Sequence, residues 1–412
     1  MEIDMKFSLA AAVFLALGSC GYSEIPVIPD NVADSALVHG NNEFAFELFG
    51  EVCSLQEDGN VFLSPFSISM ALGMTWNGAS GETASEMASV LNFTLPVQIL
   101  NEAFRRTSEE VSSGSLHGAE TGDPFTMTVS NGIWVQDEFD LLNSFVSAVT
   151  EYYSAGVENL NFTDDPEGSR ETINSWVAEN TMQKILDLIP GGMLSAETRL
   201  VLTNAVYFKA AWLHPFNELA TSPGRFALSD ESAVEVPMMT QTEFFRYASA
   251  DGWQAISLGY AGGDASMLVI LPDNMGDFME QFNGEMLDGI TKGMSRENIN
   301  LTMPRFEFTR SMPLSDILVS MGMETAFGSG ANFRAMTGDL DLFISEVLHK
   351  AYVKVDEEGT EAAAATAVVM NLTAMPTPPV EMKVNRPFIF LIHDGTTGSI
   401  LFMGRVNDPS TG

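Results

Sequence analysis

Hydrophobic residues recur at helical spacing in the first part of the chain and at strand spacing in the later part. A helix is predicted from Asn41, because an apolar residue returns at each turn, at Phe44, Leu48, Val52 and Leu55. Ser64-Pro65 predicts the start of the next helix, since serine is a favoured N-cap and proline fits the first helical position. Asp165-Pro166 predicts a later helix start for the same reason.

Apolar or alternating runs bounded by turn residues predict strands over much of the remaining chain. The clearest are Phe125–Gln136 and Arg199–Lys209. Shorter ones are predicted at Val234–Met238, Phe244–Tyr247, Trp253–Leu258, Ala265–Leu271, Ile299–Phe308, Phe388–His393 and Ser399–Val406. Helices early and strands late, with no linker after residue 40, indicate an α+β fold in a single domain over residues 41–412.

The segment Val355–Thr377 interrupts this pattern. Glu357-Glu358-Gly359 opens a tract of small residues, placed between a predicted strand that ends at Val355 and another that begins at Phe388. Composition alone favours a helix or a flexible linker. However, Pro376, Pro378 and Pro379 stop a helix. A long irregular stretch between two core strands is also uncommon unless it is functional.

Strand alternation divides this tract into two faces. One face has no charge and consists of Thr360, Ala362, Ala364, Thr366, Val368, Met370 and Leu372. The other face carries Glu361 and Asn371. The first face could therefore enter between the strands of a sheet without burying a charge, and its small side chains would limit overpacking.

The run EEGTEAAAATAVV at 357–369 resembles the reactive-loop hinge of serpins, the serine protease inhibitor superfamily. Four further segments resemble serpin signatures in the family's order: Asn60–Leu72, Asn204–Phe216, Leu348–Val355 and Asn385–Val406. The resemblance extends from about Asn41 to Pro409. It implies a fold of three β-sheets with about nine helices and an exposed reactive loop near the C-terminus, at about 357–379.

The resemblance also assigns roles to individual residues. The hinge comprises Glu357, Gly359, Thr360, Glu361, Ala362, Ala363, Ala364 and Ala365. A polar cluster under the central sheet, called the shutter, comprises Ser64, Ser67, Asn204 and His349, and the place where insertion starts, called the breach, involves Trp212 and Glu357. By residue type alone, Ser64 is simply an N-cap, His349 a core histidine and Trp212 a core aromatic.

Counting from the hinge glycine as in the family places the reactive bond at Thr373–Ala374, with Leu372 and Met375 as alternatives for the residue before the cut. No Lys or Arg lies between Lys354 and Lys383, which disfavours a trypsin-like target, since its specificity pocket carries an acid. The resemblance therefore implies a suicide inhibitor of an elastase-like, subtilisin-like or chymotrypsin-like protease. The alternative is a non-inhibitory serpin that acts as a carrier or chaperone.

An enzyme is not predicted, because the sequence has no HExxH, GxSxG, P-loop or GxGxxG motif. The histidines show no zinc spacing, and neither a metal nor a cofactor is expected. The formal net charge of −36 disfavours nucleic acid, whose phosphates need Lys and Arg. The expected partner is a serine protease, and the expected state is a monomer.

The N-terminus carries an apolar run, Leu9–Leu17, that is too short for a stable membrane span and is typical of a signal peptide. Leu17-Gly18-Ser19-Cys20 resembles the bacterial lipoprotein cleavage box, which predicts a signal peptide over 1–19 and a lipidated Cys20. The alternative is an ordinary secretory signal, and both place the protein outside the cytoplasm. Residues 20–40 are predicted to form a tether. Cys53 is predicted to be a buried thiol with no disulfide.

Overall fold

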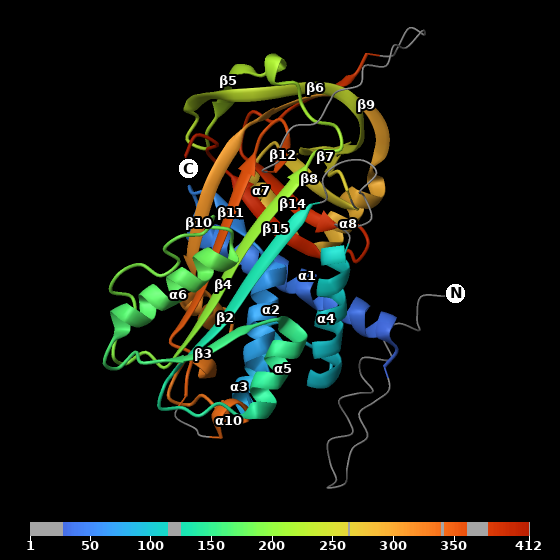
Figure 1. Ribbon diagram of the computed structural model, residues 1–412. Helices are drawn as coiled ribbons and strands as arrows, with labels where there is room; N and C mark the ends of the chain where they lie inside the picture. Colours follow the sequence, from blue (N-terminus) through green and yellow to red (C-terminus); the bar gives the residue numbers. More distant parts are fainter. Residues whose placement is uncertain (1–27, 114–124, 263, 339–341, 361–377, 412) are drawn as a thin grey trace.

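The computed structural model describes residues 28–113, 125–262, 264–338, 342–360 and 378–411. This part of the chain forms ten α-helices and two hydrogen-bonded sheets, which confirms the α+β prediction. The helices are α1 (Asp30–Leu55), α2 (Pro65–Trp76), α3 (Gly81–Val90), α4 (Val97–Ser113), α5 (Asn143–Tyr153), α6 (Pro166–Asn180), α7 (Met275–Met279), α8 (Gly284–Gly293), α9 (Ser315–Ser320) and α10 (Arg334–Thr337). Figure 1 shows that the helices α1 to α5 gather behind the lower sheet.

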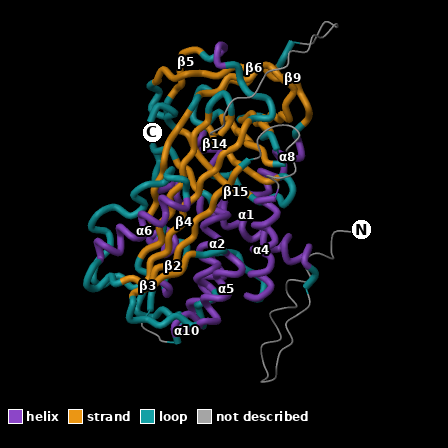
Figure 2. The backbone as a smooth tube through the Cα atoms, viewed as in Figure 1, coloured by secondary structure: helices purple, strands orange, loops and turns teal. Residues whose placement is uncertain are grey.

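The six-stranded sheet holds the candidate site. Its strands, in spatial order, are β10 (Phe306–Pro313), β11 (Glu346–Val355), β12 (Gly359–Thr360), β4 (Leu200–Ala211), β2 (Thr126–Gln136) and β3 (Gly156–Leu160). Strands β11 and β4 also pair directly with each other, and they run parallel. The pairs β10–β11 and β2–β4 are antiparallel. Figure 2 shows β2 and β4 as long, nearly aligned tubes through the lower part of the molecule.

The nine-stranded sheet forms the upper part of the molecule. It contains β1 (Val61–Leu63), β15 (Ile400–Val406), β14 (Phe388–Asp394), β8 (Ala265–Pro272), β7 (Trp253–Gly259), β6 (Ala233–Ala250), β9 (Ser295–Pro304) and β13 (Val380–Lys383), with β5 (Ser222–Ala227) paired to β6. Strand β5, strand β13 and the adjoining parts of β6 and β9 correspond to the third sheet that the resemblance implies. That sheet is continuous with the second one through β6.

Two strand predictions need correction. The separate strands predicted at Val234–Met238 and Phe244–Tyr247 are one strand, β6, because its polar middle pairs with β9 instead of turning. The single strand predicted at Ile299–Phe308 is interrupted at Arg305, where β9 of one sheet ends and β10 of the other begins.

The two faces of the six-stranded sheet pack against different elements. A small apolar core lies under α6 and includes Trp134, Ile173, Val177, Val201 and Leu348. The opposite face joins the main core, where α2 contacts β2 and β4 and where Phe62 stacks on Phe402 at a centroid distance of 5.3 Å. The side of the sheet that faces the main core is therefore shielded from water, whereas the other side keeps partly exposed residues of β11, such as Lys350 and Tyr352.

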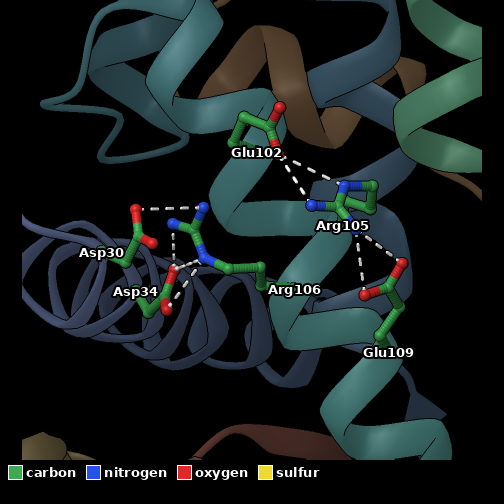
Figure 3. A network of polar contacts seen from close by, with 6 residues as sticks. All are labelled: Asp30, Asp34, Glu102, Arg105, Arg106 and Glu109. Atoms are coloured by element: carbon green, nitrogen blue, oxygen red, sulfur yellow. Dashed lines mark hydrogen bonds and ion pairs between the residues drawn. The ribbon is translucent and has the colours of Figure 1, made fainter.

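The predicted tether over residues 20–40 is wrong for its second half. Helix α1 begins at Asp30, directly after Pro29, and it buries Ala33 and Leu37. Arg106 of α4 holds this first part of the helix through ion pairs of 2.7 Å with Asp34 and 3.4 Å with Asp30 (Figure 3). The signal peptide over 1–19 and Cys20 lie outside the described residues.

Cys53 lies in the last turns of α1 as a buried free thiol, and burial raises the pKa of this thiol to about 12. This confirms the prediction of a buried thiol. Among the described helices, none combines the length and the apolar character that crossing a membrane requires.

Candidate functional site

The centre of the site is the junction between β4 and β11. The two strands pair directly from Glu346 with Val201 to Tyr352 with Tyr207. Beyond this point the two-residue strand β12 lies between them and is antiparallel to both, with Thr360 opposite Val355 on one side and opposite Ala210 on the other. The first residues of the predicted hinge therefore occupy a place in the sheet.

Gly359 owes its place in β12 to the lack of a side chain. Its φ of +156° is rarely adopted by other residues, and a Cβ built on it would lie 2.1 Å from the carbonyl oxygen of Ala210. No side-chain rotation relieves a clash with backbone. The hinge glycine is therefore required by close contact with β4.

Thr360 is buried at the same point, with an exposed fraction of 1%. Its hydroxyl lies 2.8 Å from the hydroxyl of Tyr260, and burial raises the pKa of that phenol, so it stays neutral. Tyr260 in turn stacks on Trp212, with ring centroids 4.7 Å apart and an angle of 8° between the rings. The indole Nε1–H of Trp212 donates to the carbonyl oxygen of Asp356 at 2.9 Å.

Glu357 is fixed just before β12. Its carboxylate is 2% exposed, forms an ion pair with the Arg305 guanidinium at 2.5 Å and accepts a hydrogen bond from the Thr221 hydroxyl. The backbone N–H of Phe216 donates to the carbonyl oxygen of Glu357 at 2.8 Å. The structure thus brings the two predicted breach residues, Trp212 and Glu357, to the upper end of the β4–β11 junction.

A second polar cluster lies lower down, between α2 and the sheet. It contains all four residues predicted for the shutter, and each is at most 1% exposed. His349 Nδ1 lies 2.6 Å from Asn204 Oδ1, and Nε2 accepts from the Ser64 backbone N–H at 3.2 Å. Because Nε2 accepts, Nδ1 carries the proton and donates to Asn204. The Ser67 hydroxyl also donates to Asn204 Oδ1, at 2.9 Å.

Three residues of these clusters were missed by sequence reasoning. Asn204 Nδ2 donates to Asn131 Oδ1 at 2.6 Å, so Asn131 of β2 belongs to the lower cluster. Its sequence signal was an amide inside an otherwise apolar predicted strand. Tyr260 and Arg305 lack such a signal, since their partners lie far away along the chain.

Comparison with known proteins now decides the family. The family model described as serpin (serine protease inhibitor) matches residues 39–409. The chain belongs to the serpin family. Its match begins nine residues after the start of α1.

Serpins of very different origin resemble the chain over nearly its full length. A serpin-like protein of Thermococcus kodakarensis is 38% identical and covers 96% of this chain and 92% of its own. The leukocyte elastase inhibitor of Bos taurus is 36% identical, and the match covers 90% of this chain and 98% of the inhibitor. Human thyroxine-binding globulin complexed with its hormone superposes with a TM-score of 0.82 at 27% identity, covering 92% and 100%. Uncleaved ovalbumin superposes with a TM-score of 0.81 at 26% sequence identity, and the match covers 91% of this chain and 100% of ovalbumin.

The hinge residues from Glu361 to Ala365 lie outside the described residues, as do the candidate bond Thr373–Ala374 and its alternatives Leu372 and Met375. The described residues stop at Thr360 in β12 and resume at Pro378, two residues before β13.

The buried histidine of this serpin predicts a pH dependence of stability. Burial lowers the pKa of His349 from 6.5 to about 3. Between about pH 6.5 and pH 3 the unfolded chain binds a proton at this histidine and the folded protein does not. The free energy of unfolding therefore decreases as the pH falls through this window, by several kcal/mol in all.

Urea unfolding at several pH values measures this loss. The variant His349→Gln retains a donor and an acceptor but does not titrate, so its stability should change less between about pH 6.5 and 5, where carboxylates hardly titrate. His393 is partly buried and also has a lowered pKa, and it contributes in both proteins, so the difference between them isolates His349. Parallel pH profiles for the two proteins would contradict the assignment.

Proposed function

We propose that this serpin inhibits serine proteases by a suicide mechanism in which its reactive loop inserts between β4 and β11. One observation carries the proposal: β4 and β11 are parallel neighbours, and the hinge residues Gly359 and Thr360 already lie between them at one end. A loop that continues in the direction of β12 is antiparallel to both strands. Its insertion replaces one parallel pairing, the weaker kind, by two antiparallel pairings.

The covalent step belongs to the protease. Its serine hydroxyl attacks the carbonyl carbon of Thr373, the serine proton passes through the catalytic histidine to the amide nitrogen of Ala374, and the peptide bond breaks. An ester now joins the serpin to the protease. If the cut loop inserts before water hydrolyses this ester, the protease is carried along and its active site is distorted.

The length of the tract suits this role. The residues from Thr360 to Thr373, about 14 in number, reach roughly 46 Å as a strand at about 3.3 Å each. That distance is similar to the diameter of a small domain. It is enough to move the bound protease from one end of the sheet to the other.

The test uses elastase, chymotrypsin and subtilisin, because the apolar sequence around the bond fits proteases that accept small or apolar residues. We expect an SDS-resistant complex with at least one of them and release of the 39 residues Ala374–Gly412. A released fragment that begins at Thr373 or Pro376 would move the bond to Leu372 or Met375. Cleavage by every protease without a complex would contradict inhibition.

The last outcome would favour a non-inhibitory carrier or chaperone. Thyroxine-binding globulin, one of the similar structures, was solved with its hormone, so the fold accommodates that role. The unbroken run Ala362–Ala365 supports the inhibitor, since small side chains insert with least overpacking.

A polyanion partner is not supported by the surface of α4. The structure of protease nexin-1 with heparin is among the similar ones. In this chain Arg105 pairs with Glu102 at 3.0 Å and with Glu109 at 2.8 Å, and Arg106 pairs with Asp34 (Figure 3). With these arginines held by carboxylates in a chain of net charge −36, phosphate or sulfate groups find little to attract them.

We also propose that Cys20 carries a lipid anchor and that the mature protein acts outside the cytoplasm. The sequence Leu17-Gly18-Ser19-Cys20 supports this. Expression in a bacterium with a labelled fatty acid should give a labelled protein in the membrane fraction, and Cys20→Ala should remove both label and membrane association. A Cys20→Ala protein that is still labelled would exclude the anchor, whereas an unlabelled secreted wild-type protein would indicate an ordinary signal peptide.

A further inference from the structure

The outer face of β6 and β9 carries a series of directly opposed residue pairs. The two strands run antiparallel near the top of the molecule (Figure 1). Alternate residues such as Phe245, Ile299 and Leu301 point into the core, so the residues between them face outward. The opposed outward pairs are Thr240 with Thr302, Thr242 with Asn300, Phe244 with Asn298, and Arg246 with Arg296.

Two of these pairs are joined by side-chain hydrogen bonds. The hydroxyls of Thr240 and Thr302 lie 3.3 Å apart, and the Thr242 hydroxyl donates to Asn300 Oδ1 at 3.2 Å. Asn300 Nδ2 then donates to Glu381 on β13 at 3.4 Å, and Glu381 forms an ion pair with Lys383 at 2.7 Å. Neighbouring groups therefore satisfy one another over this part of the face.

The pair Arg246 with Arg296 is different, because two like charges stand opposite each other and repel. Among the described residues, neither guanidinium forms an ion pair with a carboxylate. Arg246 Nη2 donates to the carbonyl oxygen of Thr291 at 3.0 Å, and the Arg296 guanidinium lies 5.3 Å from the centre of the Phe244 ring. Two acids close to them in sequence have other partners: Glu297 accepts from the Ser295 hydroxyl, and Asp288 pairs with Lys292.

Phe244 adds an apolar element to this cation pair. Its side chain is 46% exposed, next to two arginines that are also exposed. The chain has 55 acidic and 19 basic residues, so two opposed arginines without a carboxylate partner are an unusual arrangement for its surface. An external carboxylate group would relieve their repulsion.

We propose that Phe244, Arg246 and Arg296 form a docking surface for an acidic patch on the target protease, close to its active site. This inference rests on the proposed inhibitory function. Its location supports the choice of partner, because Val380 of β13 pairs with Ile299, the residue next to Asn298, which stands opposite Phe244. Only β9 therefore lies between the strand of Phe244 and the strand in which the chain returns after the predicted reactive loop.

The distance along the chain is consistent with simultaneous contact. Val380 follows Ala374 by six residues, which span at most about 20 Å. A protease bound at the Thr373–Ala374 bond is larger than this span, so its rim can cover the outer face of β6 and β9. Guanidinium groups bind carboxylates in paired hydrogen bonds, and such contacts mainly accelerate association and select the partner.

The experiment measures the second-order rate constant for formation of the SDS-resistant complex at low salt, with an acidic subtilisin and a basic elastase as probes. The double variant Arg246→Gln/Arg296→Gln should react about fivefold or more slowly with the subtilisin. Its rate with the elastase should not fall. Lys383→Gln is the matched control, since it removes a cation of the same face that already has a carboxylate partner, and it should leave both rates nearly unchanged. An unchanged subtilisin rate in the double variant overturns the inference.

A second variant separates docking from folding. Arg296→Glu places a carboxylate opposite Arg246, so the melting temperature should rise while complex formation with the subtilisin slows. A higher melting temperature with an unchanged rate would show that the pair has only a structural role, which overturns the docking surface. If the unchanged protein forms a complex with none of elastase, chymotrypsin and subtilisin, the proposed function fails, and this failure is distinguishable from an unchanged rate in the arginine variants.

Discussion

Replacing Thr360 by arginine is expected to abolish the covalent complex and to convert the protein into a substrate that proteases cleave and release. Thr360 is the last described residue before the loop, it is 1% exposed, and its hydroxyl faces that of Tyr260. An arginine there would bury an unpaired charge between β4 and β11, at a cost of several kcal/mol. The arginine would therefore stay out of the sheet in the intact variant, so insertion would have to bury it first and would be slower than hydrolysis of the acyl-enzyme.

The measurement is the fraction of cleaved serpin that appears as SDS-resistant complex, compared among three proteins. Thr360→Val removes only the hydroxyl and should retain most of the complex. Glu361→Arg places the same charge on the opposite face of the tract, which strand alternation predicts to be outward, and it should also retain the complex. Equal complex yields from Thr360→Arg and the wild-type protein would refute the insertion mechanism at this position.

Cleavage of the loop is expected to raise the thermal stability of the protein by about 10 °C or more. Insertion would bury Val368, Met370 and Leu372, each worth about 1.5 to 3 kcal/mol, and would add a complete strand to the sheet. A domain of this size changes its melting temperature by about one or two degrees per kcal/mol. The combined gain from the three side chains therefore corresponds to a rise of about 10 °C.

Melting curves of intact and nicked protein test this, with the cut made by a protease that is then removed. The nicked Thr360→Arg protein is the matched control and should melt near the temperature of its intact form. Equal melting temperatures before and after nicking of the wild-type chain would show that the loop does not insert, and would favour a carrier role.

Local chemistry made part of the fold predictable. Serine and aspartate at the helix starts work as the sequence implied: the Ser67 N–H donates to the Ser64 side chain, and the Gly168 N–H donates to that of Asp165. Such caps depend on residues three positions apart. The hinge, by contrast, was assigned by its resemblance to serpins, because the composition of the tract alone favours a helix or a linker.

Features that depend on distant partners could not be predicted in this way. The start of α1 at Asp30 rests on two buried apolar residues and on Arg106, which is 72 residues from Asp34. The continuity of β6 depends on β9, which pairs with its polar middle. Arg305 became part of the site only because a break between two strands places it beside Glu357.

The two residues of β12 also bear on the kinetics of the insertion that we propose. Starting a new strand is slow, because several residues lose conformational freedom before the compensating hydrogen bonds form. Gly359 and Thr360 have already passed this nucleation step. The remaining tract then enters by elongation, and the first pair to separate is Tyr207 with Tyr352, whose rings stack 6.5 Å apart. In the proposed mechanism, the rate at which this tyrosine pair opens would therefore limit how fast insertion competes with deacylation.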